Sequence, residues 1–305
     1  MFILAWRRFT VLVLSVLSLF TTAIDRMNPD YCGNYDFPRI AAEEQEPDTL
    51  RIMSFNIRVD GVNGNKTYER MWIGCRQILE IMPDSFGLQE ASDIWMIGLD
   101  TLLKKYDWVG VDIGEGGDIL KGGTASPVFY RSDKFELLDW GCFWVSDTPE
   151  VPSILSGADY GRICTWVKLK NRQTGQIYAH VNTHLDYMLE ACDRGAEIVS
   201  RFIEEHLSDV PVVFTADLNA SEKSGAYAAM TRYLTDARLA AEDCIAYGTF
   251  HDGKDPNNLA DYYIDFVLCS DDFSVASYRT VTKGVHNRFT SDHFPIYADL
   301  RFGGV

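Results

Sequence analysis

Acidic and amide side chains recur along this chain at the points where apolar, strand-like runs end. Asn56 ends the first run, Glu90 ends the second, and Asp217 follows the run Val212–Thr215. Asn219 lies two residues after Asp217, so in an extended chain the two side chains project to the same face. Ligand sites of α/β proteins gather at such strand ends. The pattern therefore predicts a polar site assembled from residues that are far apart in the sequence.

Oxygen-bearing side chains without cysteine suit a hard cation. Mg²⁺ takes oxygen ligands and is usually held by one or two carboxylates together with substrate phosphate. Such an ion polarises a P–O bond and neutralises charge on the non-bridging oxygens, so these residue types favour phosphate-ester chemistry. Water must also lose a proton, and a histidine oriented by a carboxylate is a usual base near neutral pH. His293, which follows Asp292 and could pair with Asp265 from a neighbouring strand, is the candidate.

Each of these fragments, taken alone, also fits a structural role. An Asp-x-Asn sequence after a strand is typical of a turn or a helix cap, and a single histidine such as His184 is more often structural. A carboxylate pair of Glu90 and Asp217 would suit a glycoside hydrolase, but that chemistry gives no role to Asn56 or Asn219. A non-catalytic binding module on the same scaffold stays open as the alternative. The joint occurrence, with each fragment at a strand end, favours a catalytic site.

Strand-like and helix-like segments alternate along the chain and would place these residues. The alternation of residues 50–59 predicts a strand, and the apolar spacing of residues 68–82 predicts a helix that ends at Pro83, with Arg70 and Arg76 on its outer face. Further helices are predicted over residues 92–105, 189–207 and 226–234, and further strands over residues 84–90, 127–130, 135–143, 162–169, 176–183, 210–215, 262–269 and 294–300, the last two being the final strands. Several neighbouring strands are joined by turns too short for a crossover helix, which favours mixed sheets with helices outside them.

Composition and charge narrow the function classes. The 305 residues are 47% hydrophobic, as in a packed globular protein, and 28 Lys+Arg against 44 Asp+Glu give a net charge of −16. A protein that holds long nucleic acid usually carries a basic stripe, and none is visible, so the balance favours smaller substrates. The seven cysteines include no C-x-x-C spacing, which leaves a zinc or redox motif unsupported. Cys164 and Cys269 lie in apolar runs and are predicted to be buried.

The N-terminus has the order of a targeting segment. Arg7 and Arg8 precede the largely apolar run Phe9–Phe20, which is short for a full membrane span. Residues 1–23 are therefore predicted to be a signal peptide, with a membrane anchor as the alternative, and the protein is expected to be exported, either secreted or membrane-tethered. The polar, proline-containing residues 24–48 are predicted to be a linker, which leaves residues 49–305 as the catalytic domain.

Six motifs, in this order, resemble those of the endonuclease/exonuclease/phosphatase superfamily. They are Met53-Ser54-Phe55-Asn56-Ile57, Gly87-Leu88-Gln89-Glu90, Asn182-Thr183-His184-Leu185, Thr215-Ala216-Asp217-Leu218-Asn219, Tyr263-Ile264-Asp265-Phe266 and Ser291-Asp292-His293-Phe294-Pro295. The resemblance covers about residues 50–302. It implies an α/β fold, a four-layer sandwich of two packed mixed β-sheets flanked by helices. It also implies a metal-dependent phosphoric ester hydrolase that uses Mg²⁺, with Mn²⁺ as a substitute.

The resemblance also implies a role for each motif. Glu90 would be the principal metal ligand, with Asn56 and Asp292 close to the ion. The catalytic residues would be His184, Asp217, Asn219, Asp265 and His293. The number of metal ions stays open. Asp217 and Asn219 would align the attacking water and bind the scissile phosphate, His293 would act as base or polarise the phosphate while Asp265 orients it, and His184 would stabilise the transition state or assist the leaving oxygen.

The branch of the superfamily, and with it the substrate, is less defined. Abasic-site nucleases have an aspartate and a tyrosine where this chain has Arg58 and His184, which argues against that branch. The segments around Trp144, Arg162 and His251 are similar to a bacterial exported subgroup. Arg162 and His251 are predicted substrate-phosphate contacts, because an arginine fork matches phosphate bidentately. A small molecule, a lipid and a nucleic acid all stay open as the phosphate ester; no protein partner is implied, and we expect a monomer.

Overall fold

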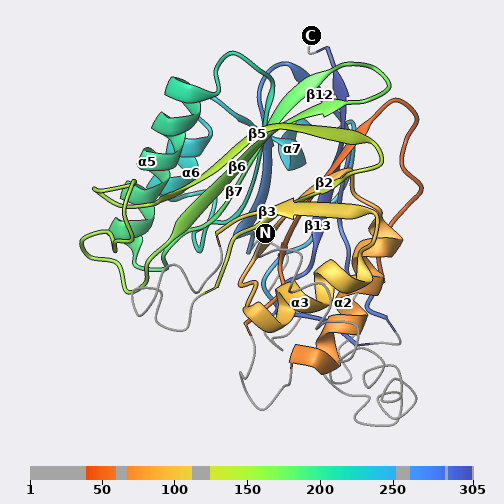
Figure 1. The fold of residues 1–305 in the computed structure, drawn as a ribbon, viewed down its shortest axis with the longest axis horizontal. Coiled ribbons are helices and arrows are strands. Elements are labelled where there is room, and N and C mark those ends of the chain that lie inside the picture. The colour runs from red at the N-terminus through yellow and green to blue at the C-terminus, as the bar shows by residue number, and fades with distance from the viewer. Residues whose placement is uncertain (1–38, 60–66, 112–123, 252–261, 286–287, 304–305) are drawn as a thin grey trace, which may run out of the picture.

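The computed structural model of the protein describes residues 39–59, 67–111, 124–251, 262–285 and 288–303 (Figure 1). The predicted targeting segment, residues 1–23, lies outside the described residues. Within the described ranges, no helix combines the length and apolar character needed to cross a membrane. The six cysteines in these ranges are free, and Cys164 and Cys269 are fully buried as expected.

The strands form two mixed sheets, as the resemblance implies. The first sheet has the order β10-β12-β13-β1-β2-β4-β3 and the second has the order β5-β6-β7-β8-β11-β9. The strand bounds are β1 Leu50–Asn56, β2 Ser85–Gln89, β3 Tyr106–Val109, β4 Val128–Arg131, β5 Phe135–Trp144, β6 Ile163–Asn171, β7 Ile177–His184, β8 Val212–Asp217, β9 Thr235–Asp236, β10 Asp243–Ile245, β11 Asp265–Cys269, β12 Phe273–Thr280 and β13 Ile296–Phe302.

Helices cover the outer face of each sheet, which completes the four layers. The helix bounds are α2 Thr67–Ile81, α3 Asp93–Leu102, α5 Leu189–His206, α6 Gly225–Met230 and α7 Ala237–Ala240. Figure 1 shows α2 and α3 together on one side of the molecule and α5 and α6 on the other. One apolar cluster lies between α2, α3 and the first sheet, a second lies between α5, α6 and the second sheet, and a third lies between the two sheets.

Most predicted elements are present within a few residues of their predicted ends. The short strands β3, β9 and β10 and the short helix α7 were not predicted. Strand β12 separates the two strands that were expected to be the final pair, and it was missed because a register shift between Val275 and Ser277 interrupts its alternation. The helix predicted over residues 226–234 ends at Met230.

Residues 39–48 of the predicted linker lie against the first sheet. The backbone N–H of Glu43 donates to the Tyr297 hydroxyl at 3.0 Å, and Gln45 Nε2 donates to Asp84 Oδ2 at 2.7 Å. Arg51 Nη1 also donates to the Glu43 carbonyl at 2.8 Å. This part of the segment is therefore tied to β1 and β13 at several points.

Strand pairing brings the motif residues to one end of the two sheets. In the first sheet β1 runs parallel to β2, with Asn56 opposite Gln89, so Glu90 follows immediately beside Asn56. In the second sheet β7 runs parallel to β8 with His184 opposite Asp217, and β11 runs antiparallel to β8 with Asp265 opposite Asp217. Residues opposite one another share a sheet face. The register therefore fixes three of the predicted catalytic side chains in one row.

A chain of buried hydrogen bonds crosses the space between the sheets. Ser85 Oγ of β2 lies 2.8 Å from His180 Nδ1 of β7, and His180 Nε2 lies 2.9 Å from Thr215 Oγ1 of β8. Thr215 Oγ1 donates in turn to Asn182 Oδ1 at 3.0 Å. Gly87 permits this close approach, because a Cβ there would come within 2.1 Å of Thr215 Oγ1 and 2.2 Å of Asn182 Oδ1.

His180 fits this chain only in its neutral form. Because Thr215 donates to Asn182 and the Tyr178 hydroxyl donates to Ser85 Oγ at 3.0 Å, the chain is complete when Ser85 donates to Nδ1 and Nε2–H donates to Thr215. A proton on Nδ1 would leave the Ser85 hydroxyl hydrogen without its acceptor. Burial lowers the pKa of His180 to about 3.

The buried histidine predicts a specific acid sensitivity. The folded-state pKa lies below the unfolded value of about 6.5, so the unfolded chain binds more protons, and the stability that neutral His180 contributes is lost as pH falls below about 6.5. Between pH 7.5 and pH 5, the unfolding free energy of the wild type should fall by about 2 kcal/mol more than that of His180→Gln, measured by urea denaturation. His206→Gln, at the exposed end of α5, is the control and should keep the wild-type slope. Equal slopes for the wild type and His180→Gln would contradict the interpretation.

Candidate active site

The amide of Asn56 joins the two sheets at the site. Its Nδ2 donates to Glu90 Oε1 at 3.2 Å, within the first sheet, and to Asp217 Oδ2 at 2.8 Å, in the second sheet. Asn56 and Asp217 are each only 1% exposed, so the hydrogen bond between them is shielded from water. A single side chain thus places the Glu90 carboxylate next to the Asp217 carboxylate.

Two residues in the left-handed region of backbone conformation shape the first-sheet half of the site. Glu90 has φ 61° and Arg58 has φ 61°. These conformations are unusual for side chains with a Cβ and gather at functional sites. In this geometry Glu90 Oε2 accepts from the Val59 N–H at 2.6 Å, and the Arg58 N–H donates to Asn56 Oδ1 at 3.0 Å. The loop after β1 therefore orients both the amide and the carboxylate.

The second-sheet half contains His184, Asp217 and Asn219. Asn219, with φ 52°, donates its backbone N–H to Asp217 Oδ1 at 2.8 Å. Its Nδ2 lies 2.8 Å from His184 Nε2 and donates to the Leu185 carbonyl at 2.9 Å. Since Nδ2 is a donor, His184 Nε2 accepts and the ring proton is on Nδ1. Burial, together with the charge of Arg162, lowers the pKa of His184 well below its usual value, so this imidazole is neutral.

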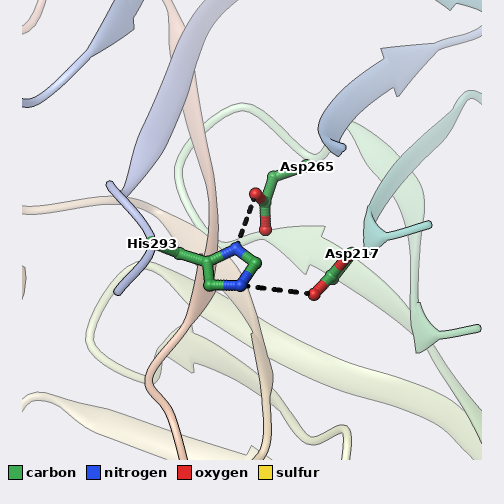
Figure 2. A group of neighbouring side chains, drawn as sticks. All are labelled: Asp217, Asp265 and His293. Atoms are coloured by element: carbon green, nitrogen blue, oxygen red, sulfur yellow. Dashed lines mark hydrogen bonds and ion pairs between the residues drawn. The ribbon is translucent and has the colours of Figure 1, made fainter. Parts of the chain in front are cut away.

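His293 lies between two carboxylates, as Figure 2 shows. Its Nδ1 is 2.8 Å from Asp265 Oδ2, and its Nε2 is 3.8 Å from Asp217 Oδ2. Burial by itself would lower the pKa of His293, but Asp265 and Asp217 outweigh it and raise the pKa to about 10. The Thr249 hydroxyl accepts from the Asp265 N–H at 3.2 Å and holds the start of β11 in place. The carboxylates therefore stabilise the imidazolium form of His293.

The same arrangement acts on Asp217. Burial and the nearby Asp265 carboxylate raise the pKa of Asp217 to about 7, against the lowering by His293 and the Asn56 hydrogen bond. The site thus contains a neutral histidine, a cationic histidine and a carboxylate that can accept a proton near neutral pH. Such a set can orient water, remove its proton and stabilise an anionic group.

The donor atoms fit a divalent cation. Ligand atoms of Asp217, Asp265 and His293 lie within 4.8 Å of one another, close enough to hold a metal ion. Because Nδ1 of His293 is engaged by Asp265 and hard cations prefer oxygen, the carboxylates of Glu90 and Asp217 around the Asn56 amide are the better match to Mg²⁺. Asp265 Oδ1 is also buried and has no hydrogen-bond partner among the described residues.

Asp292 directly precedes His293 in the chain, and the backbone N–H of His251 donates to the Asp292 carbonyl at 2.8 Å. Asp292 Oδ2 lies 3.4 Å from Arg58 Nε, so its carboxylate faces a cation of the chain itself. His251 was predicted to contact substrate phosphate, and the structure corrects this prediction. It is 2% exposed, its Nε2 lies 2.9 Å from the Ser291 carbonyl, and its ring stacks on Phe294 at 4.4 Å. His251 therefore supports the loop before His293 from inside the domain.

Arg162, the other predicted phosphate contact, lies beside the site. Its side chain is 13% exposed, and its Nε is 3.7 Å from Asp186 Oδ2. That Nε is buried and has no hydrogen-bond partner in the described part of the chain. Burial lowers the pKa of Arg162, and the charges of Asp186, Asp217 and Glu90 offset this only in part; their influence indicates that the guanidinium faces the acidic centre.

Several solved structures share this architecture. A structure from Bacteroides vulgatus described as an endonuclease/exonuclease/phosphatase is 32% identical, with 83% of this chain and 99% of that one covered and a TM-score of 0.76. A mannosyl-6-phosphatase of Bacteroides thetaiotaomicron is 28% identical, with 83% of this chain and 100% of that one covered and a TM-score of 0.75. The human Nocturnin catalytic domain, 18% identical over 88% of this chain and 97% of its own with a TM-score of 0.63, shares the fold.

Comparison by sequence alone finds a similarity over only part of the chain. No protein-family model matches the chain. One curated protein, the uncharacterized protein L388 of Acanthamoeba polyphaga mimivirus, is 30% identical over 84 residues, which are 26% of this chain and 31% of that protein. The match therefore spans less than a third of that relative.

Arg70 supports the site in a way that the sequence did not reveal. It was predicted on the outer face of its helix but is 5% exposed, and the structure overturns that prediction. Its Nη1 donates to the carbonyls of Ile57 at 2.7 Å and Thr290 at 2.8 Å, and its Nη2 donates to those of Arg58 and Val59 at 2.9 Å each. One guanidinium thus ties the loop after β1 to the loop before His293.

Loss of the hydrogen bonds from the Arg70 guanidinium should release the two loops that it joins and destabilise the domain. A lysine at position 70 cannot reach four carbonyls in a plane, so Arg70→Lys should lower the unfolding free energy by about 2–4 kcal/mol. The matched control is Arg76→Lys on the same helix, whose side chain is 49% exposed, pairs with Glu80 and lies over the Trp72 ring; it should change stability by less than about 0.5 kcal/mol. Urea denaturation of both variants tests this, and similar losses for the two would refute the role given to Arg70.

Proposed function

The chain belongs to the endonuclease/exonuclease/phosphatase superfamily, and from that premise we propose that it is a Mg²⁺-dependent hydrolase of phosphate esters. The neighbours support hydrolysis of phosphate esters, because one is described as a mannosyl-6-phosphatase and another as an endonuclease/exonuclease/phosphatase. One observation carries the proposal: Asn56 holds the Glu90 carboxylate of one sheet beside Asp217 of the other, which in turn faces His293. Every predicted catalytic side chain is within two hydrogen bonds or ion pairs of Asp217.

Glu90 would be the principal ligand of the ion, with Asn56 and Asp217 beside it. Bound there, Mg²⁺ would polarise the P–O bond and neutralise charge on the non-bridging oxygens, and Mn²⁺ is the expected substitute. Asp292 was also predicted to lie close to the ion. Its pairing with Arg58 makes it a less direct ligand in this proposal, because Arg58 already neutralises its charge.

The chain's own groups would handle the proton and the developing charge. Asp217 is the proposed base for water, because each of its oxygens accepts one hydrogen bond, from Asn56 and Asn219, and keeps a lone pair. His293, held as the imidazolium by Asp265, would donate a hydrogen bond to the phosphate. His184 would assist the leaving oxygen through its Nδ1–H, which has no acceptor among the described residues.

Arg162 is the proposed phosphate-binding residue. Its guanidinium faces the acidic centre and its Nε lacks a hydrogen-bond acceptor within the described ranges. A phosphate would complete its hydrogen bonds, and the fork of an arginine matches two phosphate oxygens. The name of the mannosyl-6-phosphatase neighbour supports a monoester substrate, and the net charge of −16 supports a small one. Export is proposed from residues 1–23 alone, and the enzyme is separately proposed to be a monomer.

Hydrolysis assays test the proposed function. The chain without residues 1–23 should release phosphate or alcohol from p-nitrophenyl phosphate or bis-p-nitrophenyl phosphate with Mg²⁺ or Mn²⁺, and EDTA should abolish turnover. Glu90→Gln and His293→Ala should each lower kcat/KM at least about 100-fold, because they remove metal binding and stabilisation of phosphate charge.

Glu80→Gln, an exposed carboxylate of α2, is the control and should match the wild type. Turnover that survives EDTA and both active-site changes would contradict the proposal. Mg²⁺ binding by calorimetry without turnover on a broad ester panel would instead support the alternative of a non-catalytic binding module.

A further inference from the structure

Two exposed tyrosines lie together beside Arg162. Tyr160, in the loop before β6, is 39% exposed, and Tyr187, in the loop after β7, is 47% exposed. Their ring centroids are 6.1 Å apart and their planes are inclined by 58°. Paired aromatic rings that face solvent next to a catalytic centre are uncommon on a soluble surface and are typical of ligand contacts.

Hydrogen bonds hold this tyrosine pair in place. Asp186 is 3% exposed; its Oδ2 accepts from the Tyr160 N–H at 3.1 Å and its Oδ1 from the Met188 N–H at 3.0 Å. The Tyr187 hydroxyl donates to Asp159 Oδ2. Both rings are therefore preorganised, which lowers the entropic cost of binding a ligand against them.

The tyrosine pair is continuous with the proposed phosphate site. Arg162 Cζ lies 5.5 Å from the centre of the Tyr160 ring. Tyr160, Arg162, Leu185 and Asp186 line one small cavity, and His184 directly precedes Leu185 in the chain. The buried Arg162 Nε, without an acceptor among the described residues, is an independent sign that a ligand completes this region.

The negative charge around the tyrosine pair argues against a leaving group that carries further phosphates. Segments 145–162 and 186–195 carry six carboxylates and two arginines. One of these arginines, Arg194, is already paired with Asp147 at 2.9 Å. Arg162 alone can balance one phosphate, but a nucleic acid would bring further phosphates against acidic loops. The group attached to the phosphate should therefore be uncharged.

The chemistry of the pair selects among uncharged groups. Two aromatic faces offer apolar surface, while the Tyr187 hydroxyl and the exposed Asp159 carboxylate offer hydrogen bonds at its edge. A pyranose ring presents the matching surfaces, with C–H groups on its faces and hydroxyls around its rim. A lipid chain would use the apolar faces only and would leave these acceptors desolvated.

We propose that Tyr160 and Tyr187 form a subsite for the sugar ring of a phosphorylated carbohydrate, with Arg162 on its phosphate. This inference rests on the proposed function and names the substrate class for that site. Tyr160 and Tyr187 are specificity-determining residues: they bind the part of the substrate that leaves.

Selectivity between two phosphate monoesters tests the subsite. The ratio of kcat/KM for a hexose 6-phosphate to kcat/KM for ethyl phosphate, which has no ring, should exceed about tenfold in the wild type. Tyr160→Ala and Tyr187→Ala should each lower that ratio about tenfold. Tyr233→Ala, an equally exposed tyrosine beyond α6, is the matched control and should keep the wild-type ratio. Circular dichroism checks that all variants are folded.

Several results would overturn the subsite. These are ratios near one, ratios that the two tyrosine changes leave alone, or a higher kcat/KM for lysophosphatidic acid or a single-stranded DNA oligonucleotide than for the hexose 6-phosphate. Saturation-transfer NMR of hexose 6-phosphate with EDTA-treated protein separates this proposal from the hydrolase itself. Transfer that Tyr160→Ala removes, in a protein that turns over no ester, would support the subsite and refute the hydrolase; no transfer and no turnover would refute both.

Discussion

The hydrogen bond from Asn56 Nδ2 to Asp217 Oδ2, 2.8 Å long and buried between the sheets, is the contact on which the site depends. Each sheet alone supplies half of the chemistry: the first provides Glu90, and the second provides His184, Asp217 and Asp265 in one row. An unpaired amide or carboxylate in this position would carry its full desolvation cost, so the sheets can pack only in the arrangement that makes this bond. The same hydrogen bond therefore both satisfies the buried polar groups between the sheets and places the catalytic side chains.

Behind this bond, the chain of polar contacts from Ser85 through His180 to Thr215 repeats the principle deeper in the domain. A fully satisfied buried polar chain adds to the specificity of this packing, because a shift of one sheet against the other would leave its members without partners. Gly87 permits it, since any side chain there would occupy the space of Thr215 and Asn182. Arg70 adds a third constraint from outside, by joining the loop after β1 to the loop that carries His293. The positions of Glu90 and His293 thus follow from contacts that themselves do no chemistry.

Much of this could be predicted from the sequence, because strand ends and their polar residues are local signals. The run before Asp217 and the motif around Asn56 indicate both the element and the site residue, and parallel pairing then brings them together. What could not be predicted depends on tertiary partners. Arg70 has the pattern of a surface arginine, and only the four carbonyls around it explain its burial. His251 has the type of a phosphate contact, but its stacking on Phe294 is invisible in the sequence, and the bulge in β12 hides that strand's period.

The central claim is that Asn56 and Asp217 act as one unit across the two sheets. A double-mutant cycle on kcat/KM for a phosphate monoester with Mg²⁺, using Asn56→Ala, Asp217→Ala and the double variant, tests it directly. Residues that act as a unit lose their contribution together, so the double variant should be no more than about threefold slower than the slower single variant. If the two losses multiplied in the double variant, the residues would act independently, and the account of a site assembled by this hydrogen bond would be wrong.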